Sequence, residues 1–387
     1  MRGWAAVVAV VLVAVVLPGP ALAETPGPAV CPGHEAPPGP PAREETVVVA
    51  APAVPAEPVG GPGLGACGDL LPAGAPAPPA VTAAGWIVAD LDSGAVLAAH
   101  DPHGRQRPAS TLKILTTLLV RERLDPAAEV VAVPEDVDVD GSRAGIGPGG
   151  HYTVRQLLSG LLLSSGNDTA MALARAMGGT AATLAAMQAR AEAVGALDTR
   201  PATPSGLDGP GMSSSAYDLA LLFRIALRDP LVQEILVTPL VDFPGFADKP
   251  GFMLSNDDPL LRTYPGALGG KTGFTDAARH TFVGAAERGG RRLVVALVRG
   301  EHQPVRMVVQ ASALLDYGFA LPPGSSVGTL VDTRPAPPTA PEPTASPAAP
   351  APTVAERSPS AVPWIVGAAA VLVAAAVATT VVLRRRR

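Results

Sequence analysis

The distribution of proline is the feature that most constrains what this chain can fold into. The 387-residue chain contains 44 prolines, and most of them lie in residues 24–80 and 321–362. Proline has no backbone N–H to donate, and segments rich in Pro and Ala are typical of tethers. Both segments are therefore predicted to be mostly irregular, the second as a linker, which leaves residues 81–320 for a folded domain.

The N-terminus resembles a targeting segment. Residues 1–23 contain Arg2, a short apolar run and the small-residue site Ala21-Leu22-Ala23, a combination typical of a cleaved secretory signal peptide. The apolar run is short for a bilayer span, and an uncleaved N-terminal anchor is the alternative.

The C-terminus predicts a membrane anchor. Trp364 to Leu383 is an uninterrupted run of 20 residues without a charge, and about 20 apolar helical residues span a bilayer. We therefore expect a transmembrane helix over 363–383. The four arginines at 384–387 predict a cytoplasmic tail, because basic residues concentrate on that side. The folded domain and the segment at 24–80 would then be extracellular at the cell membrane, with a single membrane pass.

The two cysteines of the chain, Cys31 and Cys67, both lie in the first Pro-rich segment. Outside the cell they are candidates for one disulfide. Two unpaired thiols or a lipid anchor are the alternatives, although Cys31 lies eight residues beyond Ala23, where a lipid-anchored cysteine would follow the signal directly.

Periodicity within the folded part predicts an α+β fold. Five segments are expected to be strands from their β-type patterns and turn residues, and the apolar spacing of the rest predicts helices. The expected strands are 85–90, 95–100, 267–275, 281–287 and 292–299, with a hairpin turn at 288–291. The expected helices are 109–124, two helices over 154–177 that are broken at 164–167, 180–196, 214–228 and 304–317. An antiparallel sheet that collects strands from both ends of the domain, flanked by helices and beside an all-helical lobe, is the simplest arrangement.

Three short motifs occur in order within this domain. They are Ser110-Thr111-Leu112-Lys113, Ser165-Gly166-Asn167 and Lys271-Thr272-Gly273. Each one alone is weak, since S-x-N in isolation is usually a helix-end turn. Together they are informative, because the chain has only three lysines among its 29 basic residues and two of them fall inside these motifs.

Lysine at position 113 has a chemical explanation. Residues i and i+3 of a helix share a face, so Lys113 can reach the hydroxyl of Ser110. A serine becomes a good nucleophile when a base removes its proton. A neutral lysine amine can act as that base, whereas an arginine guanidinium stays protonated. Burial and a second cation, for which Lys271 is a candidate, would lower the pKa of Lys113 into a useful range.

The surrounding sequence resembles a known family. RPASTLK, GLLLSSGNDTA, TPSGLDGPGMSSSAYDLA and YPGALGGKTGFT are similar to the low-molecular-mass D-alanyl-D-alanine carboxypeptidases of actinobacterial type, which share their three motifs with other penicillin-binding proteins and serine β-lactamases. The resemblance covers residues 85–320 almost continuously. It implies a β-lactamase/transpeptidase-like fold and no metal or other cofactor.

The resemblance also implies the residue roles. Ser110 would be the acylated nucleophile and Lys113 its base, Ser165 would relay a proton, and Asn167 would bind the substrate amide. The substrate-binding residues Lys271 and Thr272 would hold the terminal carboxylate of the substrate, and the backbone N–H of Phe274 would join that of Ser110 in binding the oxyanion. The expected partners are peptidoglycan stem peptides ending in D-Ala-D-Ala, and β-lactams as inhibitors.

Two departures from the family pattern are visible. Many relatives carry a further β domain after the catalytic one, whereas the tether here follows directly. After the K-T-G the family tends to have Ala-Gly where this chain has Ala278-Arg279, so we expect a local difference in strand geometry.

Three functions remain open at this point. The first is a D,D-carboxypeptidase, with transpeptidation or endopeptidase activity possible on the same residues. The second is a β-lactamase, which is disfavoured because the chain lacks a Glu-x-x-Leu-Asn-like stretch for deacylation. The third is a non-enzymatic sensor of penicillin or the cell wall, for which Lys113 would be unnecessary. A net charge of −5 gives no indication of a nucleic-acid partner.

The histidines give no indication of a metal site. The six histidines show no metal-ligand spacing, and five of them are interpreted as polar surface residues. These five are His100, His103, His151, His280 and His302.

Overall fold

The computed structural model describes residues 31–333 of the chain. The signal peptide predicted at 1–23 and the transmembrane helix and cytoplasmic tail predicted at 363–387 lie outside these residues. Within 31–333, no helix has the length and apolar character that crossing a bilayer requires.

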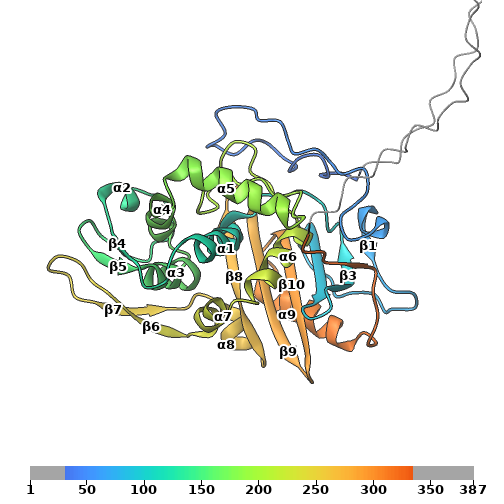
Figure 1. Ribbon diagram of the computed structural model, residues 1–387. Helices are drawn as coiled ribbons and strands as arrows, with labels where there is room; N and C mark the ends of the chain where they lie inside the picture. Colours follow the sequence, from blue (N-terminus) through green and yellow to red (C-terminus); the bar gives the residue numbers. More distant parts are fainter. Residues whose placement is uncertain (1–30, 334–387) are drawn as a thin grey trace, which may run out of the picture. The chain divides into compact units, whose positions relative to one another are not determined.

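A seven-stranded antiparallel sheet forms the centre of this region (Figure 1). The strand order is β1-β3-β2-β10-β9-β8, and β11 also pairs with β3. The strands are β1 (Asp69–Leu70), β2 (Gly85–Asp90), β3 (Ala95–His100), β8 (Ala267–Thr275), β9 (Arg279–Arg288), β10 (Arg291–Gly300) and β11 (Gly328–Thr329). The predicted bounds of β2, β3 and β8 are confirmed, and β9 and β10 are slightly longer than predicted. The turn between them places Gly289 and Gly290 at φ 58° and 77°, as a two-residue hairpin turn requires.

Each face of the sheet buries its own apolar layer. Successive residues of a strand point to opposite faces, so Ile87 and Ala89 join one core cluster, whereas Trp86 and Val88 join the other. Helix α6 (Ala216–Ala226) contacts β2 and β10 through the first cluster. The C-terminal helix α9 (Met307–Ala320) covers the second. The α+β prediction, with helices on both faces of one sheet, is confirmed.

The helical lobe lies between β3 and β8 in the sequence and beside β8 in space (Figure 1). Thr153 caps the N-terminus of α3 (Val154–Leu163) with a capping box, in which its hydroxyl accepts from the Gln156 backbone N–H. Outside the lobe, residues 31–333 also contain the 3-10 turn η1 (Pro62–Gly65). The remaining helices and 3-10 turns between β3 and β8 are η2 (Ala109–Leu112), α1 (Lys113–Arg123), α2 (Pro134–Val137), α4 (Asn167–Ala176), α5 (Thr180–Ala193), α7 (Pro230–Val237) and α8 (Pro259–Thr263). The segment between β3 and β8 also contains two antiparallel strand pairs that the sequence did not predict. They are β4 (Glu129–Val131) with β5 (His151–Thr153), and β6 (Leu240–Phe243) with β7 (Phe252–Ser255).

Residues 31–72, which we call the N-terminal arm, correct the prediction that order begins near residue 81. The arm has little regular structure, as predicted, but it is folded onto the domain. The disulfide Cys31–Cys67 is present, so that prediction is confirmed. Strand β1 pairs with β3, and Leu64 of η1 is fully buried.

Two buried cations hold the arm by its backbone. The Arg105 guanidinium donates to the carbonyls of Glu35, Pro52 and Ala53, and His103 contacts the Val59 carbonyl through Nε2 at 3.0 Å. A Pro-rich chain has unused carbonyls but few N–H groups, so buried side-chain donors can fix it without regular secondary structure. This explains why periodicity did not reveal the arm.

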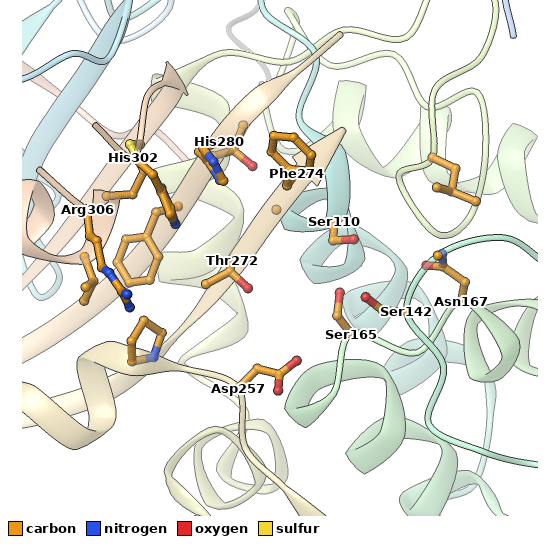
Figure 2. Close-up of a pocket in the computed structure, with 18 of the residues that line it drawn as sticks. Ser110, Ser142, Ser165, Asn167, Asp257, Thr272, Phe274, His280, His302 and Arg306 are labelled. Atoms are coloured by element: carbon orange, nitrogen blue, oxygen red, sulfur yellow. The ribbon is translucent and has the colours of Figure 1, made fainter. Parts of the chain in front are cut away.

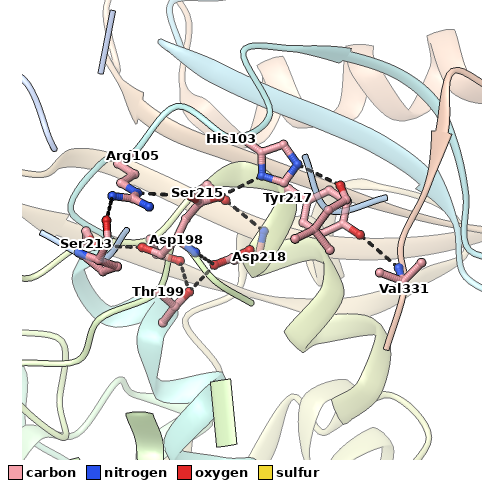
Figure 3. Close-up of polar contacts among 12 residues, drawn as sticks. His103, Arg105, Asp198, Thr199, Ser213, Ser215, Tyr217, Asp218 and Val331 are labelled. Atoms are coloured by element: carbon pink, nitrogen blue, oxygen red, sulfur yellow. Dashed lines mark hydrogen bonds and ion pairs between the residues drawn. The ribbon is translucent and has the colours of Figure 1, made fainter. Parts of the chain in front are cut away.

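Both cations meet the same carboxylate (Figure 3). Asp198 accepts from Arg105 Nε at 3.1 Å and contacts His103 Nδ1 at 2.8 Å. Asp218 lies beside it and accepts from the Asp198 backbone N–H and the Thr199 hydroxyl. The interpretation of His103 as a surface residue was therefore wrong, since only 8% of it is exposed.

The C-terminal boundary also differs from the prediction of a tether from residue 321. Strand β11 pairs with β3, Leu330 is buried, and the Tyr217 hydroxyl bonds to the Thr329 carbonyl and the Val331 N–H. The chain therefore stays on the domain for about ten residues beyond the predicted end.

Candidate active site

Ser110 lies where the chain turns into the helical lobe. Ala109 has a φ of 48°, and η2 and α1 follow without interruption from it. Two neighbouring segments approach the backbone of residues 109 and 110 closely. A β-carbon on Gly273 would lie 2.9 Å from the Ser110 backbone nitrogen, and one on Gly206 would lie 2.0 Å from the Ala109 carbonyl oxygen. Two glycines therefore allow strand β8 and the loop before α6 to close around the partly exposed serine.

Lys113 points at Ser110, as the i, i+3 spacing predicted. Its Nζ lies 2.9 Å from Ser110 Oγ, 2.7 Å from Asn167 Oδ1 and 2.6 Å from the Ser205 carbonyl oxygen. A neutral amine has two N–H groups and one lone pair. Asn167 and the Ser205 carbonyl can accept both N–H groups, which leaves the lone pair directed at the Ser110 hydroxyl.

The surroundings of Lys113 disfavour its charged form. The side chain is fully buried. Burial, and then the nearby charge of Lys271, hold the pKa of Lys113 well below its ordinary value, while Asp168 opposes them. The opposition is limited, because the Asp168 carboxylate already accepts from the backbone N–H groups of residues 144, 145, 146 and 169.

The second motif forms the wall between α3 and α4. Ser165 has a φ of 60° and is 6% exposed, and Asn167 begins α4 with its amide nitrogen donating to the Asp140 carbonyl at 2.6 Å. Both residues line the cavity in front of Ser110. The break predicted at 164–167 is thus the segment that brings Ser165 and Asn167 to Ser110.

The third motif lies on β8. Lys271 is buried, with Nζ 2.9 Å from the Thr272 carbonyl oxygen. Burial lowers its pKa to about 8, against the charges of Asp257 and Asp258. Thr272 and Phe274 line the cavity, and the Phe274 side chain is 48% exposed.

All three motifs meet at one cavity of about 550 Å³. Lys113 and Lys271 are buried behind it, and the other five predicted site residues line it. Figure 2 shows Ser110, Ser142 and Ser165 on one side of the cavity, Arg306, His302 and His280 on the other, and Thr272 between them.

The far side of the cavity holds residues that the sequence did not indicate. His280 and His302 stack with ring centroids 3.4 Å apart, and Arg306 lies beside them. Burial and the neighbouring His302 lower the pKa of His280, and burial and Arg306 lower that of His302. The surface interpretation holds for His302, which is exposed, and in part for the half-buried His280, but it did not place either residue at the cavity. Only pairing across β8 and β9, which puts Phe274 opposite His280, could have placed His280 here.

Two groups of potential metal ligands occur within residues 31–333, and in each of them one member has no donor atom left for a metal. The first contains Cys31, whose sulfur is in the disulfide. The second contains His103, whose two ring nitrogens face Asp198 and the Val59 carbonyl. Two acceptors call for two ring protons, and the raised pKa of His103 agrees with a protonated ring.

At Arg279, where the family pattern has glycine, the backbone has a φ of 56°. This left-handed conformation is unusual for a residue with a side chain. Arg279 nevertheless opens β9, and its guanidinium pairs with Glu301 at 2.8 Å. The departure is confined to the start of one strand.

Comparison with known proteins agrees with this geometry. Residues 73–301 match the peptidase family S11, D-alanyl-D-alanine carboxypeptidase. The chain is 49% identical over 267 residues to D-alanyl-D-alanine carboxypeptidase DacB2 of Mycobacterium tuberculosis, covering 68% of this chain and 91% of that protein. A crystal structure of a D-alanyl-D-alanine carboxypeptidase from M. tuberculosis H37Rv superposes with a TM-score of 0.65 at 48% identity, covering 67% of this chain and 99% of that one.

A third similarity fixes the fold class. The Streptomyces K15 DD-transpeptidase superposes with a TM-score of 0.60 at 28% identity, covering 64% of this chain and all of that one. The fold is thus the mixed penicillin-binding and β-lactamase-like type, as predicted. With its three motifs assembled at one cavity, the chain belongs to the D-alanyl-D-alanine carboxypeptidases of peptidase family S11.

Proposed function

We propose that the protein is a serine-type D-alanyl-D-alanine carboxypeptidase that removes the terminal D-Ala from peptidoglycan stem pentapeptides. The contact that carries the proposal is the one between Lys113 Nζ and Ser110 Oγ, 2.9 Å apart, in surroundings that lower the pKa of the lysine. A buried amine of lowered pKa is a suitable base for a serine nucleophile.

The first half of the reaction forms an ester. Ser110 Oγ bonds to the carbonyl carbon of the penultimate D-Ala, and its proton passes to Lys113 Nζ. The backbone N–H groups of Ser110 and Phe274 hold the oxyanion. The peptide C–N bond then breaks, and the departing D-Ala nitrogen receives a proton through Ser165.

The second half returns the enzyme. Water attacks the ester carbon, Ser110 regains its proton, and the shortened peptide leaves. Lys271 and Thr272 meet the substrate carboxylate during the first half, and Arg306 adds a cation on the same wall. Asn167 holds the substrate amide and also fixes one N–H of Lys113.

Release of D-Ala tests this function. The full-length protein should release one D-Ala from a pentapeptide ending in D-Ala-D-Ala, and Ser110→Ala should release none. The similarity to a DD-transpeptidase raises the question of transfer, and added glycine tests whether the acyl group also passes to amines. Release by Ser110→Ala at the native rate would refute the acyl-enzyme.

A β-lactam adduct separates the carboxypeptidase from a β-lactamase. Penicillin should add once to Ser110 and stay, because no deacylating glutamate stretch was identified in the sequence. Mass spectrometry should show a lasting single addition. Rapid turnover of a chromogenic cephalosporin would favour a β-lactamase, and an adduct without any D-Ala release would favour the sensor.

We also propose that the protein is held in the cell membrane by a single C-terminal helix, with the catalytic domain outside. The supporting features are the apolar run Trp364 to Leu383, the four arginines after it and the signal-like N-terminus. Protease added to intact cells should remove the catalytic domain and leave a small membrane fragment. A protected catalytic domain would refute this topology.

A further inference from the structure

A second cavity continues from the catalytic one. It measures about 510 Å³ and shares Gly141, Leu207 and Phe274 with the cavity in front of Ser110. Its outer wall is formed by residues 38–44 of the N-terminal arm. We call this cavity the arm groove. The arm lies outside the 73–301 region that matches the family, so this wall belongs to the chain's own N-terminal segment.

The arm is fixed well enough to form a wall. Ala42 is buried, and Glu45 accepts from the Arg107 guanidinium at 2.9 Å, with both side chains largely buried. The Arg105 contacts to the arm backbone and the Cys31–Cys67 disulfide hold the preceding residues. A ligand in the groove would therefore meet preorganised groups.

The charges facing the groove are mainly negative and unpaired. Among residues 31–333, no ion-pair partner lies within 4.0 Å of the four carboxylates that line it. They are Glu44, Asp140, Asp208 and Asp276. Two of the three arginines there are engaged, Arg107 with Glu45 and Arg299 with the carbonyls of Pro38 and Ala277. Only the Arg107 charge is offset by a carboxylate, because carbonyls do not neutralise the Arg299 guanidinium. The four unpaired carboxylates still outnumber the two remaining cations, Arg43 and Arg299, so the groove favours a positively charged ligand.

Asp208 is the acid that points most directly to a ligand. Only 8% of the residue is exposed, and its Oδ1 has no hydrogen-bond partner within the described region. Burial raises the pKa of Asp208, and a hydrogen bond from Thr275 and the charge of Arg107 oppose the rise. A buried carboxylate oxygen without a donor is costly and uncommon, so a donor from a ligand would satisfy Oδ1 of Asp208.

We propose that the arm groove binds a primary ammonium group carried by a peptide at the catalytic cavity, with Asp208 as the acceptor. The inference rests on the proposed function, because that peptide reaches the groove from Ser110. The ammonium has two possible sources. In the first, the ammonium belongs to a side chain of the peptide that acylates Ser110. In the second, it belongs to a side chain of another molecule, whose own α-amine accepts the acyl group.

The first comparison distinguishes these sources on the acylating side. Two peptides are used, each ending in L-Lys-D-Ala-D-Ala, one with a free and one with an acetylated ε-amine. If the donor peptide carries the ammonium, the native full-length protein should prefer the free amine by about tenfold or more in kcat/KM, as expected for one charge-assisted hydrogen bond. Asp208→Asn should bring the two peptides to within about twofold of each other.

The second comparison addresses the accepting side. The acyl-enzyme is offered D-lysine or its uncharged analogue D-norleucine, and the α-amine displaces Ser110 Oγ from the acyl carbon while losing one proton. If the acceptor carries the ammonium, the native protein should form about tenfold more product with D-lysine. Asp208→Asn should remove that preference and leave the two donor peptides unchanged.

Penicillin labelling separates failure of this inference from failure of the proposed function. Asp208→Asn should label Ser110 at close to the native rate, since Asp208 is not in contact with Ser110 or Lys113. Glu44→Gln, on the exposed rim, should shift the same preference by about two- to threefold and cannot disturb the core. This second variant, together with the native preferences, decides the question if Asp208→Asn does not fold.

Two results would overturn the inference. One is a native protein without preference in either comparison. The other is an Asp208→Asn variant that labels normally and retains the native preference, or that slows all substrates equally.

Discussion

Two of the buried clusters of charge within residues 31–333 are built in opposite ways. Behind the catalytic cavity, Lys113 and Lys271 are buried, with no carboxylate within 4.0 Å of either amine among the described residues. Under the N-terminal arm, the buried cations Arg105 and His103 both meet Asp198.

The difference shows in the pKa shifts. In the first cluster, burial and repulsion lower the pKa of Lys113. In the second, hydrogen bonding and attraction from Asp198 overcome burial and raise the pKa of His103. A buried charge with a partner holds the structure together, whereas a buried charge without one is ready to lose a proton. Catalysis needs the second condition.

The largest expected effect is on acylation in Lys113→Arg. Arginine keeps the charge but cannot give up its proton near neutral pH. Loss of a general base typically costs 10²–10⁴-fold, so penicillin labelling of Ser110, followed by mass spectrometry, should fall by about that factor. A cooperative melt would show that the domain still folds. Labelling at close to the native rate would remove Lys113 from the role of base.

The paired cluster should respond in stability instead. Asp198→Asn leaves Arg105 and His103 without a counter-charge, and breaking a buried pair costs about 3–5 kcal/mol. Denaturant unfolding should show that loss, while Ser110 still labels under folding conditions. The matched control is Glu234→Gln, which breaks the exposed pair with Arg155 and should cost less than about 1 kcal/mol. Equal losses in the two variants would contradict the contrast between the clusters.

Lys271 allows the charge to be separated from the side chain. Lys271→Met removes the repulsion that lowers the pKa of Lys113, so the pH profile of acylation should move to higher pH. Lys271→Arg keeps a cation that can bind a carboxylate, and it should keep the profile while weakening D-Ala release, mainly through substrate binding. The exposed Lys249 supplies the control, because Lys249→Met should change neither property. If the pH profile of acylation did not move in Lys271→Met, burial alone would account for the lowered pKa of Lys113.

The smallest effect concerns Asp218. Burial and then Asp198 raise its pKa to about 8, well above the ordinary 3.8. Between those values the native carboxyl holds a proton that the unfolded chain has released, so its contribution to stability falls as pH rises through that window. Asp218→Asn cannot ionise and should lose less stability than the native protein between pH 6 and pH 9. If the melting temperatures of the native protein and of Asp218→Asn fell by the same amount across that pH range, the raised pKa of Asp218 would be contradicted.

Local pattern predicted the catalytic side of the molecule well. The bounds of β2, β3 and β8 and the break before Asn167 follow from turn residues and alternation, and the Ser110–Lys113 contact follows from helix geometry. These features depend on residues close together in the sequence.

The arm and the far wall of the cavity could not be predicted in this way. The arm is held by Arg105 and His103 through carbonyls up to 70 residues away, and backbone carbonyls leave no trace in composition. His302 and Arg306 lie between the end of β10 and the start of α9, and they reach the cavity because β10 pairs with β9, which puts Gly300 opposite His280. Polar residues placed by long-range topology have no periodicity of their own.

The pH dependence of Ser110 acylation in the native protein tests the central claim most directly. Burial and Lys271 should make Lys113 a neutral base well below its ordinary pKa of 10.5. The rate of penicillin adduct formation, measured by mass spectrometry at short times, should therefore rise and reach a plateau well below pH 10.5. A rate that still climbs through pH 10.5, as for an exposed lysine, would contradict the account.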